Sequence, residues 1–114
     1  MTRLTEVDVE RRLPDRLTGL VGEERAARFM ATAEATRTLL GGRAVINVNS
    51  TAKGGGVAEL LQTLLAYARG VGVDARWFVV EGNPAFFDIT KRIHNHLYGV
   101  PGDGGPLGPA ERQV

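Results

Sequence analysis

With 114 residues, the chain is long enough for one small domain and too short for two. Hydrophobic residues make up 43% and charged residues 24%, and the net charge of +1 excludes the strong positive field of a nucleic-acid binder. Cysteine is absent, which excludes disulfides and thiolate metal ligands. Residues 1–12 lack the apolar core of a signal peptide, and no apolar run approaches the roughly 20 residues that span a bilayer. We therefore expect a soluble cytoplasmic protein with no nucleic-acid and no membrane partner.

The N-terminal part of the chain has helical patterns. Leu4 to Leu20 is weakly amphipathic and is interrupted by Pro14, which suits the first turn of a short helix. We expect residues 1–22 to form a helical arm. Glu23 to Leu40 carries apolar residues at three- and four-residue spacing, and Gly41-Gly42 follows it as a C-cap would. The residues expected on the buried face of this helix are Ala26, Phe29, Met30, Ala33 and Leu40.

The middle of the chain alternates strand and helix patterns. Arg43 to Asn49 is short, β-branched and nearly continuously apolar, which is typical of a buried parallel strand. A glycine loop follows, then a helix over Val57 to Gly70 and a second strand over Val73 to Glu81 that contains Trp77. Such a βαβ unit predicts an α/β fold with a right-handed crossover. The helix residues expected to be buried are Val57, Leu60, Leu61, Leu64, Leu65 and Ala68.

A last helix is predicted from Asn83-Pro84 to about Tyr98, because asparagine caps helices and proline suits the first helical position. Its residues expected to be buried are Phe86, part of Phe87, Ile89 or Thr90, Ile93 and Leu97, with Lys91 and Arg92 exposed. Residues 99–114 are rich in glycine and proline, so we expect a disordered tail there and a partial Rossmann-like domain over residues 23–98.

Two strands are too few for a complete doubly wound sheet, and their edges would be exposed. Two explanations stay open at this point. The chain is a piece of a longer protein, or it completes its sheet with another copy of itself, which would make it a homo-oligomer through the open sheet edge.

The glycine loop is the main candidate for chemistry. A strand that runs through Gly54, Gly55 and Gly56 into a helix aims backbone N–H groups and the positive end of the helix dipole at one point, which suits a phosphate or another anion. Lys53 precedes the glycines, so the Walker phosphate-loop pattern does not match. Glu59 stands where the dinucleotide fingerprint needs its third glycine, although Glu81 lies near the end of the second strand. A plain tight turn with a solvated lysine is the alternative.

Three blocks of sequence carry a family resemblance. They are Val48 to Leu61, which includes Lys53-Gly54-Gly55-Gly56-Val57-Ala58, then Asp74 to Pro84 with Phe86-Phe87, and Thr90 to Asn95. In this order they resemble the N-terminal part of the trehalose-forming, glycogen-synthase-like retaining glycosyltransferases of family 4. The resemblance implies a GT-B fold, in which two Rossmann-like domains face each other across a cleft. It covers about Leu17 to Gly99.

The resemblance implies that the intact enzyme transfers glucose from a nucleoside diphosphate glucose donor to a sugar acceptor. Lys53, Gly54, Gly55, Gly56 and Val57 would then bind the donor diphosphate, since only glycine lets the backbone approach so closely. The acceptor sugar would lie near Asn49, Ser50 and Glu81.

Neither a metal nor an organic cofactor is implied, and His94 and His96 cannot share a helix face. No catalytic residue is assigned, because the second domain that would complete the cleft is missing. We therefore expect no activity from the chain alone. The alternative is a non-catalytic α/β module that binds an anion or associates with itself, and a nicotinamide-binding half-domain is a third reading that Glu59 opposes.

Overall fold

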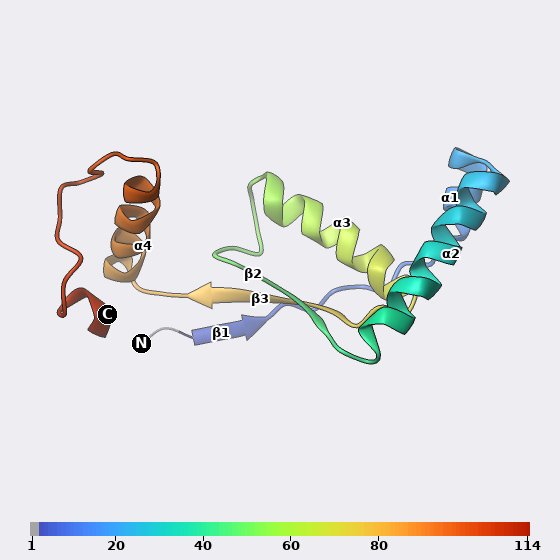
Figure 1. The fold of residues 1–114 in the computed structure, drawn as a ribbon, viewed down its shortest axis with the longest axis horizontal. Helices are drawn as coiled ribbons and strands as arrows, with labels where there is room; N and C mark the ends of the chain where they lie inside the picture. The colour runs from blue at the N-terminus through green and yellow to red at the C-terminus, as the bar shows by residue number, and fades with distance from the viewer. Residues whose placement is uncertain (1–2) are drawn as a thin grey trace. The chain divides into compact units, whose positions relative to one another are not determined.

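The computed structural model describes residues 3–114 and separates into two compact units, residues 3–5 with Val80–Val114, and Glu6–Val79. Residues 1 and 2 of the expected N-terminal arm lie outside the described residues. The elements, labelled in Figure 1 apart from η1, are β1 (Arg3–Glu6), α1 (Asp15–Val21), α2 (Glu23–Leu40), β2 (Val45–Asn49), α3 (Gly56–Gly70), β3 (Ala75–Glu81), α4 (Pro84–Leu97) and the 3-10 turn η1 (Glu111–Gln113). The strands and helices predicted between Glu23 and about Tyr98 are therefore confirmed, within two residues at their ends.

The sheet has three strands in the order β1-β3-β2. β2 and β3 are parallel, with Val45 opposite Ala75 and Asn49 opposite Val79, and α3 connects them and lies against one face (Figure 1). This confirms the predicted α/β class with a partial Rossmann-like βαβ unit. β1 runs in the opposite direction beside β3, and the Val7 N–H donates to the Trp77 carbonyl at 2.8 Å.

The helix expected from Leu4 onward is wrong at its start, where the structure has the strand β1. Arg3–Glu6 is a strand, and helical structure begins only at Asp15, directly after Pro14. All four residues of β1 are exposed, so no buried stripe marks it in the sequence. Its conformation comes from backbone pairing with β3, a long-range interaction that overrides the weak local helical pattern. The structure thus adds an antiparallel edge to the parallel pair.

The core of the Glu6–Val79 unit lies between α3 and the sheet. Its buried members are Val9, Ala58, Leu61, Leu65, Ala66, Ala75 and Trp77. Trp77 is 1% exposed, and its indole N–H donates to the Asn49 side-chain oxygen at 2.7 Å. This bond ties the last residue of β2 to the centre of β3 just before the glycine loop.

Several residues expected in the core are exposed instead. On α3, Val57, Leu60 and Leu64 face solvent, because only the side of the helix that carries Ala58, Leu61 and Leu65 meets the sheet. β2 was expected to be buried, yet Ile46 is 58% and Val48 54% exposed. Side chains alternate along a strand, so these two lie on the face opposite α3, which no element of the Glu6–Val79 unit covers.

α2 packs along α1, but of the face expected to be buried only Ala33 is fully so (Figure 1). Phe29 and Met30 are exposed, at 41% and 43%, because α1 and α2 leave an open pocket between them that these two side chains line. Gly41 ends α2 in the left-handed conformation, with φ of 58°, as predicted for its C-cap. Within residues 3–114, none of the helices combines the length and apolarity that crossing a bilayer requires.

α4 begins as the sequence predicted. The Asn83 side chain accepts a hydrogen bond from the Phe86 N–H at 2.8 Å, and Pro84 occupies the first helical position. Ile93 and Leu97 were expected to be buried and are exposed.

Arg92 was expected to be exposed but is half-buried, because its guanidinium binds Asp103 at 2.8 Å and the Pro106 carbonyl at 3.1 Å. These bonds hold part of residues 99–114 against α4 within their own unit. The Gly105 N–H also binds Asp103, and with Arg92 it lowers the pKa of that carboxyl. The division of the chain into residues 1–22, 23–98 and 99–114 stays a prediction.

Candidate functional site

The glycine loop joins the end of β2 to the start of α3, and a threonine hydroxyl fixes its shape. The Thr51 hydroxyl donates to the Lys53 carbonyl at 2.6 Å and accepts from the Lys53 N–H at 3.1 Å. Gly54 and Gly55 follow with φ of 72° and 78°, where a side chain would be strained. Thr51 is not among the residues predicted for the site, although serine and threonine hydroxyls are known to close turns by bonding to the backbone two residues on.

The loop presents backbone donors that the protein itself does not use. Among the hydrogen bonds of residues 3–114, none employs the N–H of Gly54, Gly55, Gly56 or Val57. The first bond of α3 runs from the Glu59 N–H to the Gly55 carbonyl. All four unused donors belong to exposed residues at the positive end of a 15-residue helix. The arrangement is therefore open to an anionic ligand.

A depression of about 460 Å³ lies along this loop. Lys53, Gly54 and Gly55 line it, and so do Ala52, Ala58, Glu59, Gln62 and Thr63. The Lys53 ammonium is exposed and forms no ion pair within the described part of the chain. The amide of Gln62 donates to the Ala52 carbonyl at 3.4 Å and so supports the loop from the second turn of α3. Gly56 and Val57 continue the same backbone into the helix without lining the depression.

The residues expected near the acceptor sugar do not line this depression. The Asn49 side-chain oxygen accepts a hydrogen bond from the Trp77 indole N–H, which gives this side chain a structural role. Ser50 is exposed in the bend after β2. Glu81 belongs to the other compact unit, where it pairs with Arg3 at 2.7 Å. Hydrogen bonds from the side chains of Arg3 and Thr5 lower the pKa of the Glu81 carboxyl, and the bond from Arg3 has the larger effect.

One of the two histidines lies against another aromatic ring. The ring of His94 lies 4.9 Å from that of Tyr98 in the last turn of α4. Across residues 3–114, no three histidine or acidic side chains come together in a way that could hold a metal ion.

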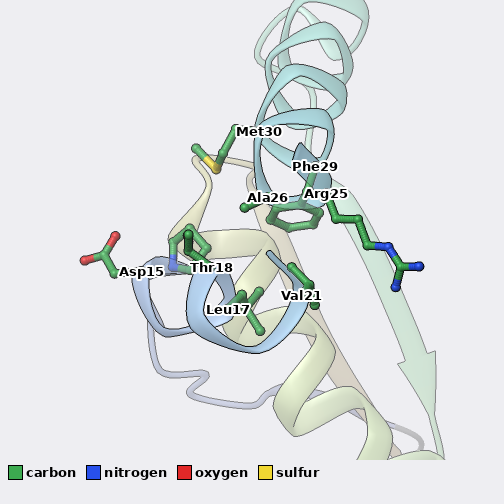
Figure 2. A pocket seen from close by; sticks show the side chains of 9 residues that line it. Asp15, Leu17, Thr18, Val21, Arg25, Ala26, Phe29 and Met30 are labelled. Carbon is green, nitrogen blue, oxygen red and sulfur yellow. The ribbon is translucent and has the colours of Figure 1, made fainter. Parts of the chain in front are cut away.

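A separate apolar pocket of about 320 Å³ lies between α1 and α2 (Figure 2). Its wall is formed by Leu17, Val21, Ala26, Phe29 and Met30, with Pro14 and Thr18 completing it. Asp15 and Arg25 are at its rim, and their charged ends point away from it in Figure 2. This pocket offers apolar contact and no charge, so it does not fit a phosphate or a sugar.

The βαβ unit and its exposed glycine loop define an α/β protein of the partial Rossmann-like type. The family model described as "Trehalose synthase, N-terminal domain" matches residues 47–114, which include the whole loop and β3. Because this match covers more than half of the chain, the chain belongs to the family of trehalose synthase N-terminal domains. The resemblance found in the sequence blocks is therefore confirmed.

Individual relatives agree with this family. The trehalose synthase of Pyrococcus horikoshii is 45% identical over 80 residues, which make up 70% of this chain and 18% of the relative. That of Rubrobacter xylanophilus is 47% identical over 61 residues, 54% of this chain and 15% of the relative. The trehalose phosphorylase of Grifola frondosa is 40% identical over 52 residues, 46% of this chain and 7% of the relative. The chain thus spans less than a fifth of the length of these curated relatives.

Proposed function

We propose that this chain is the glycine-loop part of a glycosyltransferase related to the trehalose synthases. In the intact enzyme, Lys53, Gly54, Gly55, Gly56 and Val57 bind the diphosphate of a nucleoside diphosphate glucose, and glucose passes to a sugar acceptor. The observation that carries this proposal is the set of exposed N–H groups at Gly54 to Val57 that no acceptor of the described chain uses.

The electrostatics of the loop favour a dianionic group over a neutral one. Hydrogen bonds from N–H groups to a charged oxygen are roughly twice as strong as neutral ones, and the helix N-terminus adds a further favourable term of about 0.3–1 kcal/mol. Lys53 adds a positive charge beside these donors, while Glu59 in the first turn of α3 adds a negative one. In a transferase the same donors stabilise the leaving diphosphate as negative charge builds on it.

We also propose that the chain has no transferase activity by itself. The chain matches less than a fifth of the relatives, and a cleft that holds both donor and acceptor needs a second wall. An assay for release of UDP or ADP from the corresponding glucose nucleotide tests this. Sustained turnover by the purified chain would refute the proposal.

The diphosphate site is tested by exchanging Gly56 for alanine. Gly56 has ordinary backbone angles and open space where a Cβ would stand, so Gly56→Ala leaves the fold intact or stabilises it by up to about 1 kcal/mol. A bound phosphate that approaches this backbone meets the new methyl group, so we expect the affinity for ADP or UDP to fall at least about fivefold. NMR titration with ADP, UDP and pyrophosphate measures this at the amides of residues 54–57.

Gly19→Ala is the matched control, since Gly19 also lies in a helix of the same unit with open space around it. This variant is expected to change stability like Gly56→Ala and to leave nucleotide binding unchanged. Equal binding by Gly56→Ala and the unmodified chain, or no shift at the loop amides with any of the three probes, contradicts the proposed site.

A second candidate function is favoured by the outer side of the sheet. β2 forms an edge, and its sequence Val45–Asn49 contains none of the charged or proline residues that commonly protect edges. With Ile46 and Val48 exposed, the chain could act as a module that associates with itself through this strand. Sedimentation of the chain and of Val48→Lys distinguishes the two functions: a dimer abolished by Val48→Lys, together with no nucleotide binding, favours the module.

A further inference from the structure

The pocket between α1 and α2 leaves apolar side chains in contact with water (Figure 2). Val21, Phe29 and Met30 line it, and all three are exposed. Burying such side chains removes apolar surface from water and is favourable. Exposed apolar surface with a polar rim commonly marks the site of an interaction with another molecule. The question is therefore what kind of partner the rim selects.

The rim of the pocket carries two opposite charges. Asp15 is the first residue of α1, and Arg25 lies near the start of α2. Figure 2 shows them on opposite sides of the pocket. Both side chains are exposed, and neither forms an ion pair within residues 3–114. The surface thus has an apolar centre with a negative charge on one side and a positive charge on the other.

A surface with this arrangement is complementary to itself. In a two-fold dimer the same patch of both copies meets, so a residue on one side of the centre lies against the partner's residue from the opposite side. Asp15 of one copy then meets the partner's Arg25, and the reverse pair forms at the same time. A second copy of the chain therefore supplies the apolar centre and both matching charges at once.

The size of this face sets the strength of the association. α1 has 7 residues and α2 has 18, so the two helices are about 10 Å and 27 Å long and about 10 Å wide. Together they offer a face of roughly 400 Å² per copy, about half of the roughly 800 Å² that each partner buries in a standard interface. We therefore expect a weak and reversible contact, with a dissociation constant on the order of 100 μM.

We propose that the chain forms a weak two-fold dimer through α1 and α2. The four helices of the two copies pack together as a bundle, and Phe29 and Met30 of each copy lie over the pocket of the other. Asp15 and Arg25 fix the relative orientation of the copies by forming one ion pair on each side of the pocket. This surface is separate from the glycine loop and from the edge strand β2, so the dimer does not depend on nucleotide binding.

Paired charge reversals test the two-fold geometry. Sedimentation equilibrium of the full chain at up to about 1 mM, roughly ten times the expected dissociation constant, measures the affinity. Asp15→Arg and Arg25→Asp each place like charges at both ion-pair positions, so each should weaken the dimer at least about tenfold. Mixing these two variants restores opposite charges at both positions, and the mixture should dimerise about as well as the unmodified chain. Glu24→Arg is the control, because it reverses a neighbouring charge that does not line the pocket.

The apolar centre is tested by Phe29→Ala. Aromatic side chains at the centre of an interface commonly contribute most to affinity, so this variant should weaken the dimer about tenfold. Leu39→Ala is the matched control, since Leu39 is exposed on the same helix and does not line the pocket. It should leave the affinity unchanged. Circular dichroism of each variant verifies that it is folded.

Several outcomes overturn this inference. They are a chain that stays monomeric at the highest concentration, a dimer that neither charge reversal weakens, and two charge-reversed variants that do not recover the dimer when mixed. A dimer that Val48→Lys abolishes and Asp15→Arg leaves intact forms through β2 and overturns the inference as well.

Discussion

Replacing Asn49 with alanine removes the acceptor of the Trp77 indole N–H. The donor cannot turn to water, because Trp77 is 1% exposed and its bond to Asn49 is 2.7 Å long. A buried donor left without a partner costs about 1–3 kcal/mol, and the half-buried Asn49 side chain loses some packing as well. We expect Asn49→Ala to lower the free energy of unfolding by about 2 kcal/mol.

A double-mutant cycle with Trp77→Phe isolates the hydrogen bond. Phenylalanine keeps an aromatic ring in the core and has no donor, so Asn49→Ala should be much less costly in the Trp77→Phe background. The coupling energy between the two sites should be about 1–2 kcal/mol. Urea unfolding followed by far-ultraviolet circular dichroism measures all four variants. Because Trp77 is the single tryptophan of the chain, its fluorescence separately reports solvent entry in Asn49→Ala. A coupling energy below about 0.3 kcal/mol, within the error of additivity, refutes the reasoning.

Two further predictions concern packing and pH. Leu61 is 9% exposed and Leu60 is 61% exposed. Leu61→Ala should therefore destabilise the fold by about 2–4 kcal/mol, and Leu60→Ala by less than about 0.5 kcal/mol. Equal midpoints of urea unfolding for the two variants would contradict the packing described for α3. Arg3→Ala should raise the pKa of Glu81 back toward its ordinary value of 4.5, as NMR titration of its side-chain carboxyl measures. A carboxyl group whose pKa is lower in the folded than in the unfolded protein stabilises the fold when the pH is above the unfolded pKa, and this stabilisation is lost as the pH falls through the folded pKa. Arg3→Ala should therefore lower the free energy of unfolding more at neutral pH than in acid.

The elements that local sequence signals mark were predicted well, whereas the features that depend on long-range contacts were not. Asn83 and Pro84 mark the start of α4, and Gly41 marks the end of α2, because caps depend on a few neighbouring residues. Arg3–Glu6 carries no such signal, since its strand conformation depends on a partner strand far along the chain. The exposure of Leu60 was missed for a related reason: its apolar side chain indicates burial only if another surface covers it.

The same difference between local signals and long-range contacts applies to the candidate site. The glycine loop was recognisable because its backbone requires residues without a side chain, and φ at Gly54 and Gly55 is positive as that requirement implies. The structural bond of Asn49 was hidden, since nothing near it in the sequence indicates that Trp77 is its partner.

The pairing of β1 with β3 has a consequence for synthesis on the ribosome. Arg3 and its partner Glu81 are 78 residues apart, so the first strand leaves the ribosome long before its partner exists. At elongation rates of roughly 5–20 residues per second, β1 waits about 4–16 seconds for its partner, with its backbone N–H and carbonyl groups hydrated. Its four solvent-facing side chains, with Arg3 and Glu6 among them, keep that waiting segment compatible with water and poorly suited to aggregation.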